Sequence, residues 1–171
     1  MKRENPEPRI KAFLGKYSPE IAAQLRAART HLRALFPRGH ELVYDNYNAL
    51  VFGFSPSDRS SEAFLSVAGY PRWINLFFLR GVDLDDPTHL LKGAGKQVRS
   101  IRLGSEHRLT DPAVHALIAQ AIEAHRDALG NAVPLQTTVK SVSPTQRTRK
   151  PAARPKVRRM SRAKSRRKAA R

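Results

Sequence analysis

The sequence predicts an α+β domain in which an antiparallel sheet of about five strands is packed by N-terminal and C-terminal helices, followed by a disordered basic tail. Three observations lead to this prediction. Apolar residues recur at helical spacing near both ends of the first 130 residues, apolar residues alternate in the stretch between, and residues 128–171 contain no Asp or Glu. We therefore place the domain at residues 1–130 and the tail at residues 131–171.

Helices are predicted before and after the strands. Ser18 can cap a helix, Pro19 and Glu20 suit its first turn, and apolar residues then recur every three or four positions as far as Pro37. A shorter helix is indicated within residues 1–17. The last helix is predicted to begin at residues 110–112 and to end at Gly130, a residue type typical of helix C-termini.

Five strands are predicted between these helices, at residues 41–47, 49–54, 63–69, 72–79 and 98–103. Most of the connections between them are short, which favours antiparallel pairing. The stretch 72–79 has apolar residues on both faces, a pattern typical of a central strand covered on both sides.

Composition excludes several classes of protein and of site. The chain has no cysteine, so disulfides, thiolate zinc sites and cysteine nucleophiles are excluded. No apolar stretch approaches the ~20 residues that span a bilayer, and the first residues lack the apolar region of a signal peptide. We therefore expect a soluble, cytoplasmic protein with no membrane partner.

Three segments resemble the YdhG-like family, small bacterial domains of largely unknown function. They are ELVYDNYN at residues 41–48, YPRWINLFF at residues 70–78 and LKGAGKQVR at residues 91–99. The resemblance covers about residues 13–125 and none of the tail. It implies an α+β fold with an antiparallel sheet. Some members are described as frataxin-like iron chaperones, so it also implies iron handling as an alternative function.

The sequence offers two candidate ligand sites. In the first, the Gly-rich stretch 93–96 presents backbone N–H groups and Lys96 to a small anion, with Arg99 and Arg102 close by in sequence. This stretch is not a P-loop, because the Ser/Thr and the helix that must follow are missing. The alternative interpretation is a tight turn before the last strand, with Lys96 in solvent.

The second candidate lies at the end of the first predicted strand. Tyr44 and Asn46 share one face there, and polar groups beside aromatic ones suit a ligand pocket, together with Trp73 and Arg72. The alternative is a hydrogen-bonded strand end on which tyrosines cap the core. The candidate ligand-binding residues are therefore Tyr44, Asn46, Trp73, Lys96, Arg99 and Arg102.

Catalytic and metal sites receive no comparable support. The stretch 53–57 lacks the final Gly of a nucleophile elbow, and the six histidines show no His-x-x-x-His pair. The acidic cluster Asp83, Asp85 and Asp86 lacks the spacing of a calcium loop, and a frataxin-type site would need a dense acidic ridge. We identify no catalytic residue, no metal ligand and no cofactor.

The tail predicts a polyanionic partner. Residues 128–171 supply +14 of the formal net charge of +18, because they hold Lys140 and thirteen further cations and no acid. Such a segment displaces counterions from phosphates and binds nucleic acid without sequence preference. The predicted contacts are Arg147, Arg149, Lys150, Arg154, Lys156, Arg158, Arg159, Arg162, Lys164, Arg166, Arg167, Lys168 and Arg171.

Together these observations predict a binding protein whose domain recognises a small anionic ligand or a partner and whose tail tethers it to nucleic acid, either DNA or RNA. DNA binding would associate it with the nucleoid. The alternative is an iron-handling or small-anion-handling protein in which the tail only adds solubility.

Overall fold

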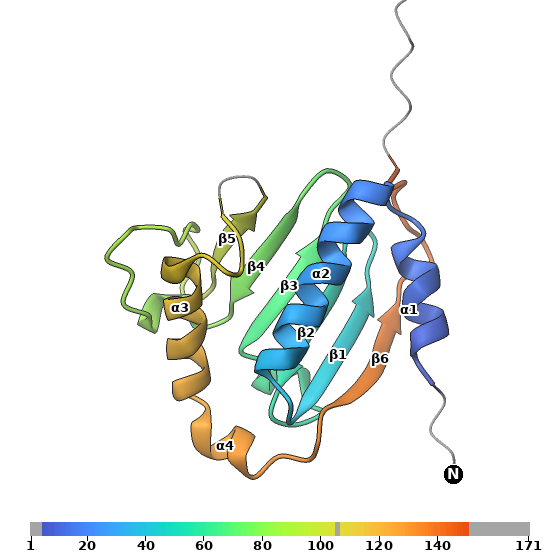
Figure 1. The fold of residues 1–171 in the computed structure, drawn as a ribbon. Coiled ribbons are helices and arrows are strands. Elements are labelled where there is room, and N and C mark those ends of the chain that lie inside the picture. The colour runs from blue at the N-terminus through green and yellow to red at the C-terminus, as the bar shows by residue number, and fades with distance from the viewer. Residues whose placement is uncertain (1–4, 105–106, 151–171) are drawn as a thin grey trace, which may run out of the picture.

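The computed structural model describes residues 5–104 and 107–150, and these form an α+β fold (Figure 1). The helices are α1 (Glu7–Leu14), α2 (Pro19–Leu35), α3 (Pro112–Glu123) and α4 (Arg126–Gly130). The strands are β1 (His40–Asp45), β2 (Leu50–Ser55), β3 (Leu65–Gly69), β4 (Ile74–Phe78), β5 (Arg99–Leu103) and β6 (Gln136–Val142). No helix in these two ranges is long and apolar enough to cross a membrane.

The sheet has six strands in the order β5-β4-β3-β2-β1-β6. β1 to β5 pair antiparallel with their neighbours, as predicted, but β6 pairs parallel with β1. The prediction of a purely antiparallel sheet of about five strands is therefore wrong in its last strand. β6 is an edge strand with a largely exposed, Thr- and Ser-containing sequence, so it shows no apolar alternation.

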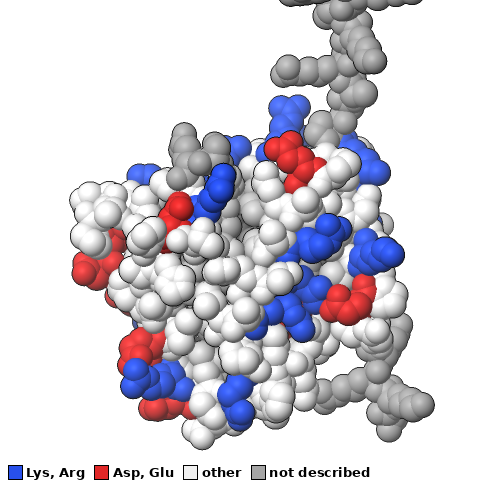
Figure 2. All heavy atoms as spheres, in the orientation of Figure 1, with Lys and Arg blue, Asp and Glu red and all other residues white. Residues whose placement is uncertain are grey.

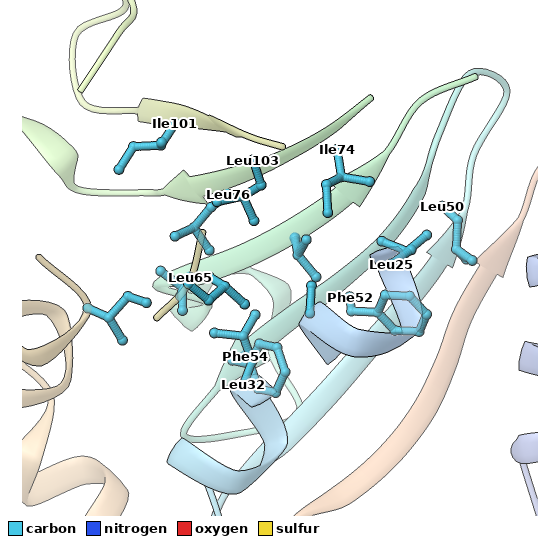
Figure 3. Close-up of a cluster of buried hydrophobic side chains, with 14 of the residues drawn as sticks. Leu25, Leu32, Leu50, Phe52, Phe54, Leu65, Ile74, Leu76, Ile101 and Leu103 are labelled. Atoms are coloured by element: carbon cyan, nitrogen blue, oxygen red, sulfur yellow. The ribbon is translucent and has the colours of Figure 1, made fainter. Parts of the chain in front are cut away.

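The helices pack on one face of the sheet (Figure 1). Alternate strand residues point into the core that this packing closes, and Leu25 and Leu32 of α2 meet them from the helix side (Figure 3). β4 alternates between buried and partly exposed residues, so one face of the stretch predicted to be covered on both sides is only partly buried.

A glycine lets α2 sit close to β3. A Cβ atom at Gly69 would lie 2.5 Å from Cδ2 of Leu25, so a larger residue there would force the Leu25 side chain to move. Tyr17, just before α2, links this helix end to β3 and β2. Its hydroxyl donates a hydrogen bond to the Gly69 carbonyl at 2.6 Å and accepts one from the Leu50 N–H at 2.8 Å. Burial raises the pKa of Tyr17 to about 12.

Two carboxylates on β1 are fully buried on the helix face. The first, Glu41, accepts hydrogen bonds from Arg29 Nε at 2.7 Å, Arg33 Nη1 at 2.5 Å and Thr137 Oγ1 at 2.7 Å. Arg29 also donates two bonds to Glu7 of α1, and they lower the pKa of that carboxyl. Glu41 thus connects α2 and β6 to β1 directly and α1 through Arg29.

The second buried carboxylate, Asp45, binds the end of the described chain. It accepts hydrogen bonds from Lys16 Nζ at 2.5 Å, Gln146 Nε2 at 2.7 Å and Arg149 Nη1 at 2.5 Å. The Arg149 guanidinium also lies over the Tyr17 ring, 5.2 Å from its centroid. Burial acts to raise the pKa of Asp45, but the bonds from Lys16, Gln146 and Arg149 outweigh it and hold the pKa below its ordinary value.

These contacts correct the predicted domain boundary. The disordered tail was predicted to begin at residue 131, but residues 136–142 form β6 and residues 143–149 bond to the β1–β2 hairpin. Arg149 was predicted to contact nucleic acid. Its side chain is only 1% exposed in its ion pair with Asp45, so it is not available to phosphates. The predicted contacts from Arg154 onward lie outside the described residues.

We predict that Arg149→Leu lowers the free energy of unfolding in urea by about 3 kcal/mol, because removing one partner of a buried ion pair leaves the other poorly compensated. Arg147→Leu is the matched control. Arg147 is exposed and lies two residues away, and its replacement should change stability by less than about 0.5 kcal/mol. Equal effects of the two variants would contradict the structural role of Arg149.

Candidate ligand-binding pocket

A pocket of about 850 Å³ lies between α2 and the segment that leads into α3. α2 packs on β3 and β4, and α3 lies toward the β5 edge of the same face (Figure 1). The pocket occupies the space between them, above the start of β4 and the end of β5. Its walls include Ser18, Ile21, Gln24, Ala28, His31, Arg72, Trp73, Arg102, Leu103, Arg108 and Leu109.

Three arginines bring positive charge to this pocket. Arg72, Arg102 and Arg108 are exposed and line it. Within the described ranges, none of the three forms an ion pair with a carboxylate, whereas seven other Lys and Arg residues do: Lys16, Arg29, Arg33, Arg59, Arg80, Arg126 and Arg149. Glu20 also lines the pocket, and its carboxylate accepts a long bond of 3.5 Å from Gln24.

An aromatic stack holds one of these arginines in place. The Arg102 guanidinium carbon lies 4.7 Å from the centroid of the Trp73 ring, and Trp73 in turn stacks on Tyr70 with ring centroids 5.3 Å apart. A guanidinium that stacks on a ring keeps its N–H edge free for a planar acceptor. The stack therefore leaves the N–H edge of Arg102 free for a carboxylate or phosphate.

One of the residues that line the pocket, His31, has a buried ring nitrogen without a partner. His31 Nε2 is inaccessible to solvent and makes no hydrogen bond to any described residue. Four other buried polar atoms in the described ranges share this condition, and none of their residues lines the pocket. Buried polar groups are nearly always hydrogen-bonded, and a buried polar group without a hydrogen bond requires an explanation.

The structure brings together only two of the six predicted ligand residues. Trp73 and Arg102 line the pocket, with Arg72 beside them. Arg99 does not join Arg102, because the two lie three residues apart on β5 and so on opposite faces of the strand. The Arg99 guanidinium instead donates to the carbonyls of Gly95 and Val98 at 2.6 and 2.8 Å.

Lys96 lies in the same loop as these carbonyls and is exposed. The Gly-rich stretch 93–96 is therefore part of a turn before β5, with Gly93 at φ 136°, a conformation that favours glycine. The prediction that Lys96, Arg99 and Arg102 share one anion site is wrong.

Tyr44 and Asn46 are also remote from the pocket. β1 is separated from β5 by three strands, a distance of about 19 Å at the usual strand spacing. The Tyr44 hydroxyl pairs with Ser60 Oγ at 2.5 Å. Asn46 is exposed in the β1–β2 hairpin, where its backbone carbonyl accepts a hydrogen bond from Arg149. The single concavity predicted for these residues and Trp73 does not exist.

The acidic cluster serves the local structure. Asp83 pairs with Arg80 at 2.8 Å, and Asp86 accepts bonds from the N–H groups of Leu90 and Leu91 at 3.1 and 2.8 Å. Across residues 5–104 and 107–150, no three His, Asp or Glu side chains are grouped as metal ligands.

Sequence reasoning missed two important pocket residues. His31 lies in the middle of α2, and Arg108 lies more than 70 residues further along the chain. Neither belongs to a local motif, and only the packing of α2 beside the segment before α3 brings them to one wall.

Comparison with family models, with curated proteins and with solved structures finds no match to this chain. The resemblance to the YdhG-like family therefore stays a prediction.

Trp73 is the only tryptophan of the chain, so its fluorescence reports on this pocket alone. We predict that Arg102→Gln makes Trp73 more accessible to acrylamide quenching, because the variant removes the guanidinium that covers the ring. Arg99→Gln, on the same strand but facing away, should leave the quenching unchanged. Quenching that responds equally to both variants would contradict the stack.

Proposed function

We propose that this protein binds a small organic anion in the pocket between α2 and α3, and that its basic C-terminal residues hold it on nucleic acid. One observation carries the first part of this proposal. Three arginines that pair with no carboxylate of the described residues line one pocket, together with His31.

The lining of the pocket indicates what kind of ligand fits. The arginines suit a carboxylate or phosphate group, to which a guanidinium can donate two parallel hydrogen bonds. Ile21, Ala28 and Leu109 offer an apolar wall to the body of the molecule. The volume of about 850 Å³ falls within the range of small-molecule sites. An anion with an aromatic or aliphatic body meets these conditions better than a bare inorganic ion does.

The C-terminal cations support the second part of the proposal. With Arg149 buried, twelve of the thirteen cations from Arg147 onward remain as candidates for phosphate contacts. If half of these cations contact phosphates at once, the logarithm of the binding constant falls with the logarithm of the salt concentration at a slope of about −5. Binding of this kind is independent of sequence, so the C-terminal residues would set where the protein resides and the pocket would set what it recognises.

We predict that phenyl phosphate binds the full chain saturably and changes Trp73 fluorescence, with inorganic phosphate binding more weakly. The double variant Arg72→Gln/Arg102→Gln should weaken binding at least tenfold, because a hydrogen bond between charged groups contributes about 1.5–3 kcal/mol. Arg80→Gln/Arg126→Gln, which removes the same charge away from this pocket, is the matched control. Equal affinities of the two double variants would contradict the site.

For the C-terminal residues we predict that the full chain retards an arbitrary DNA duplex strongly at low salt, and that a chain ending at Lys150 loses most of this affinity. The chain is shortened at Lys150 rather than at the predicted boundary at residue 130, because β6 and Arg149 are part of the fold. A shortened chain that binds DNA as tightly as the full one would contradict the tether.

A further inference from the structure

We infer that the ligand of the pocket between α2 and α3 carries a protonated amine as well as its anionic group, and that Glu20 binds the amine. The inference rests on the proposed function, because it concerns the same pocket. It narrows the ligand from a small organic anion to a zwitterion, and it makes Glu20 a residue that determines specificity. The distribution of charge between the two sides of the pocket supports it.

The side of the pocket that α2 contributes has one charged residue, which is acidic. The pocket-lining residues between Ser18 and His31 contain a single Asp, Glu, Lys or Arg, and this residue is Glu20. α2 also carries three arginines, but none of them lines the pocket. The α2 side therefore offers a carboxylate to a ligand, and no cation of that side neutralises it.

The opposite side of the pocket has the reverse charge. Its lining comes from the residues at the start of β4, the end of β5 and the segment before α3, and it includes Arg72, Arg102 and Arg108 but no Asp or Glu. Asp111 follows this segment, and its carboxylate accepts a hydrogen bond from the Arg108 backbone N–H at 2.7 Å. The pocket thus has one acidic side and one basic side.

The two kinds of charge in the pocket do not neutralise one another. Among the described residues Glu20 forms no ion pair, and the one hydrogen bond to its carboxylate is the long bond from Gln24. Figure 2 shows basic and acidic side chains near one another at the upper end of the surface between α2 and α3, above a mostly uncharged area. A ligand with an ammonium and an anionic group can pair with both sides of the pocket at once.

The chemistry of Glu20 favours an amine over the alternatives. A ligand that is only anionic gains from the arginines but is repelled by the carboxylate, whereas an ammonium adds an attraction. In the part of the chain that the structure describes, Glu20 belongs to no group of three possible metal ligands. Its place in the first turn of α2 stabilises the ionised carboxylate. Amino acids and amine-bearing phosphate esters share the required chemistry.

The test uses the full chain, Trp73 fluorescence and two pairs of ligands whose members differ by one amine. The phosphate pair is phosphotyramine and p-ethylphenyl phosphate, and the carboxylate pair is L-phenylalanine and hydrocinnamate. The amine is far from the anionic group in the first pair and beside it in the second, so the two pairs distinguish the two ligand classes. Each ligand is titrated into the natural chain, Glu20→Gln and the matched control Glu123→Gln, which removes the same charge from an exposed residue outside this pocket.

We expect the natural chain to bind the amine-bearing member of at least one pair about fivefold more tightly than its plain partner, as an ion pair partly exposed to solvent allows. Glu20→Gln should abolish this preference by weakening the amine-bearing ligand, with the plain anion bound at least as tightly as before. Glu123→Gln should keep the preference, and circular dichroism verifies the fold of both variants.

Two kinds of failure are distinguishable. Saturable binding of the plain anions without a preference for the amine in either pair would overturn the inference and leave the proposed function intact. A preference that survives Glu20→Gln, or that Glu123→Gln abolishes equally, would also overturn the assignment to Glu20. Absence of saturable binding by all four ligands would overturn both the inference and the proposed function.

Discussion

The fold depends on two buried carboxylates of β1, Glu41 and Asp45, and on the cations that neutralise them. They lie four residues apart on one face of the strand, and neither side chain is exposed. A buried carboxylate without partners costs several kcal/mol, so each requires its full set of donors. For Glu41 those donors come from α2 and β6, and for Asp45 they are Lys16, Gln146 and Arg149. The first helices and the last described residues are thereby fixed to the same strand.

This arrangement also positions the candidate site. Arg29 and Arg33 hold one flank of α2 on β1, and Gly69 lets the helix approach β3. The opposite flank then lines the pocket and brings His31 toward the end of β5 and the segment before α3. One flank of α2 therefore pairs with β1 while the other lines the pocket, and the buried ion pairs fix the orientation of the helix between them.

Much of the fold was predictable because its signals are local. Consecutive residues carry the Ser18 cap with Pro19, which the structure confirms at the start of α2. Consecutive residues also carry the apolar alternation of β2. β6 was not predictable, because an exposed edge strand needs no apolar alternation. Arg149 looked like any other tail cation, since its partner Asp45 lies 104 positions away. In the pocket, Trp73 and Arg102 stood out by residue type, whereas His31 became significant only through its burial without a partner.

Urea unfolding of three chains, ending at Gly130, at Lys150 and at Arg171, shows whether the buried carboxylates of β1 depend on the C-terminal segment. If the buried carboxylates require the C-terminal segment, the chain ending at Lys150 unfolds cooperatively with the free energy of the full chain. The chain ending at Gly130, which lacks Thr137, Gln146 and Arg149, should lose several kcal/mol or fail to fold. A chain ending at Gly130 that is as stable as the full one would contradict the account.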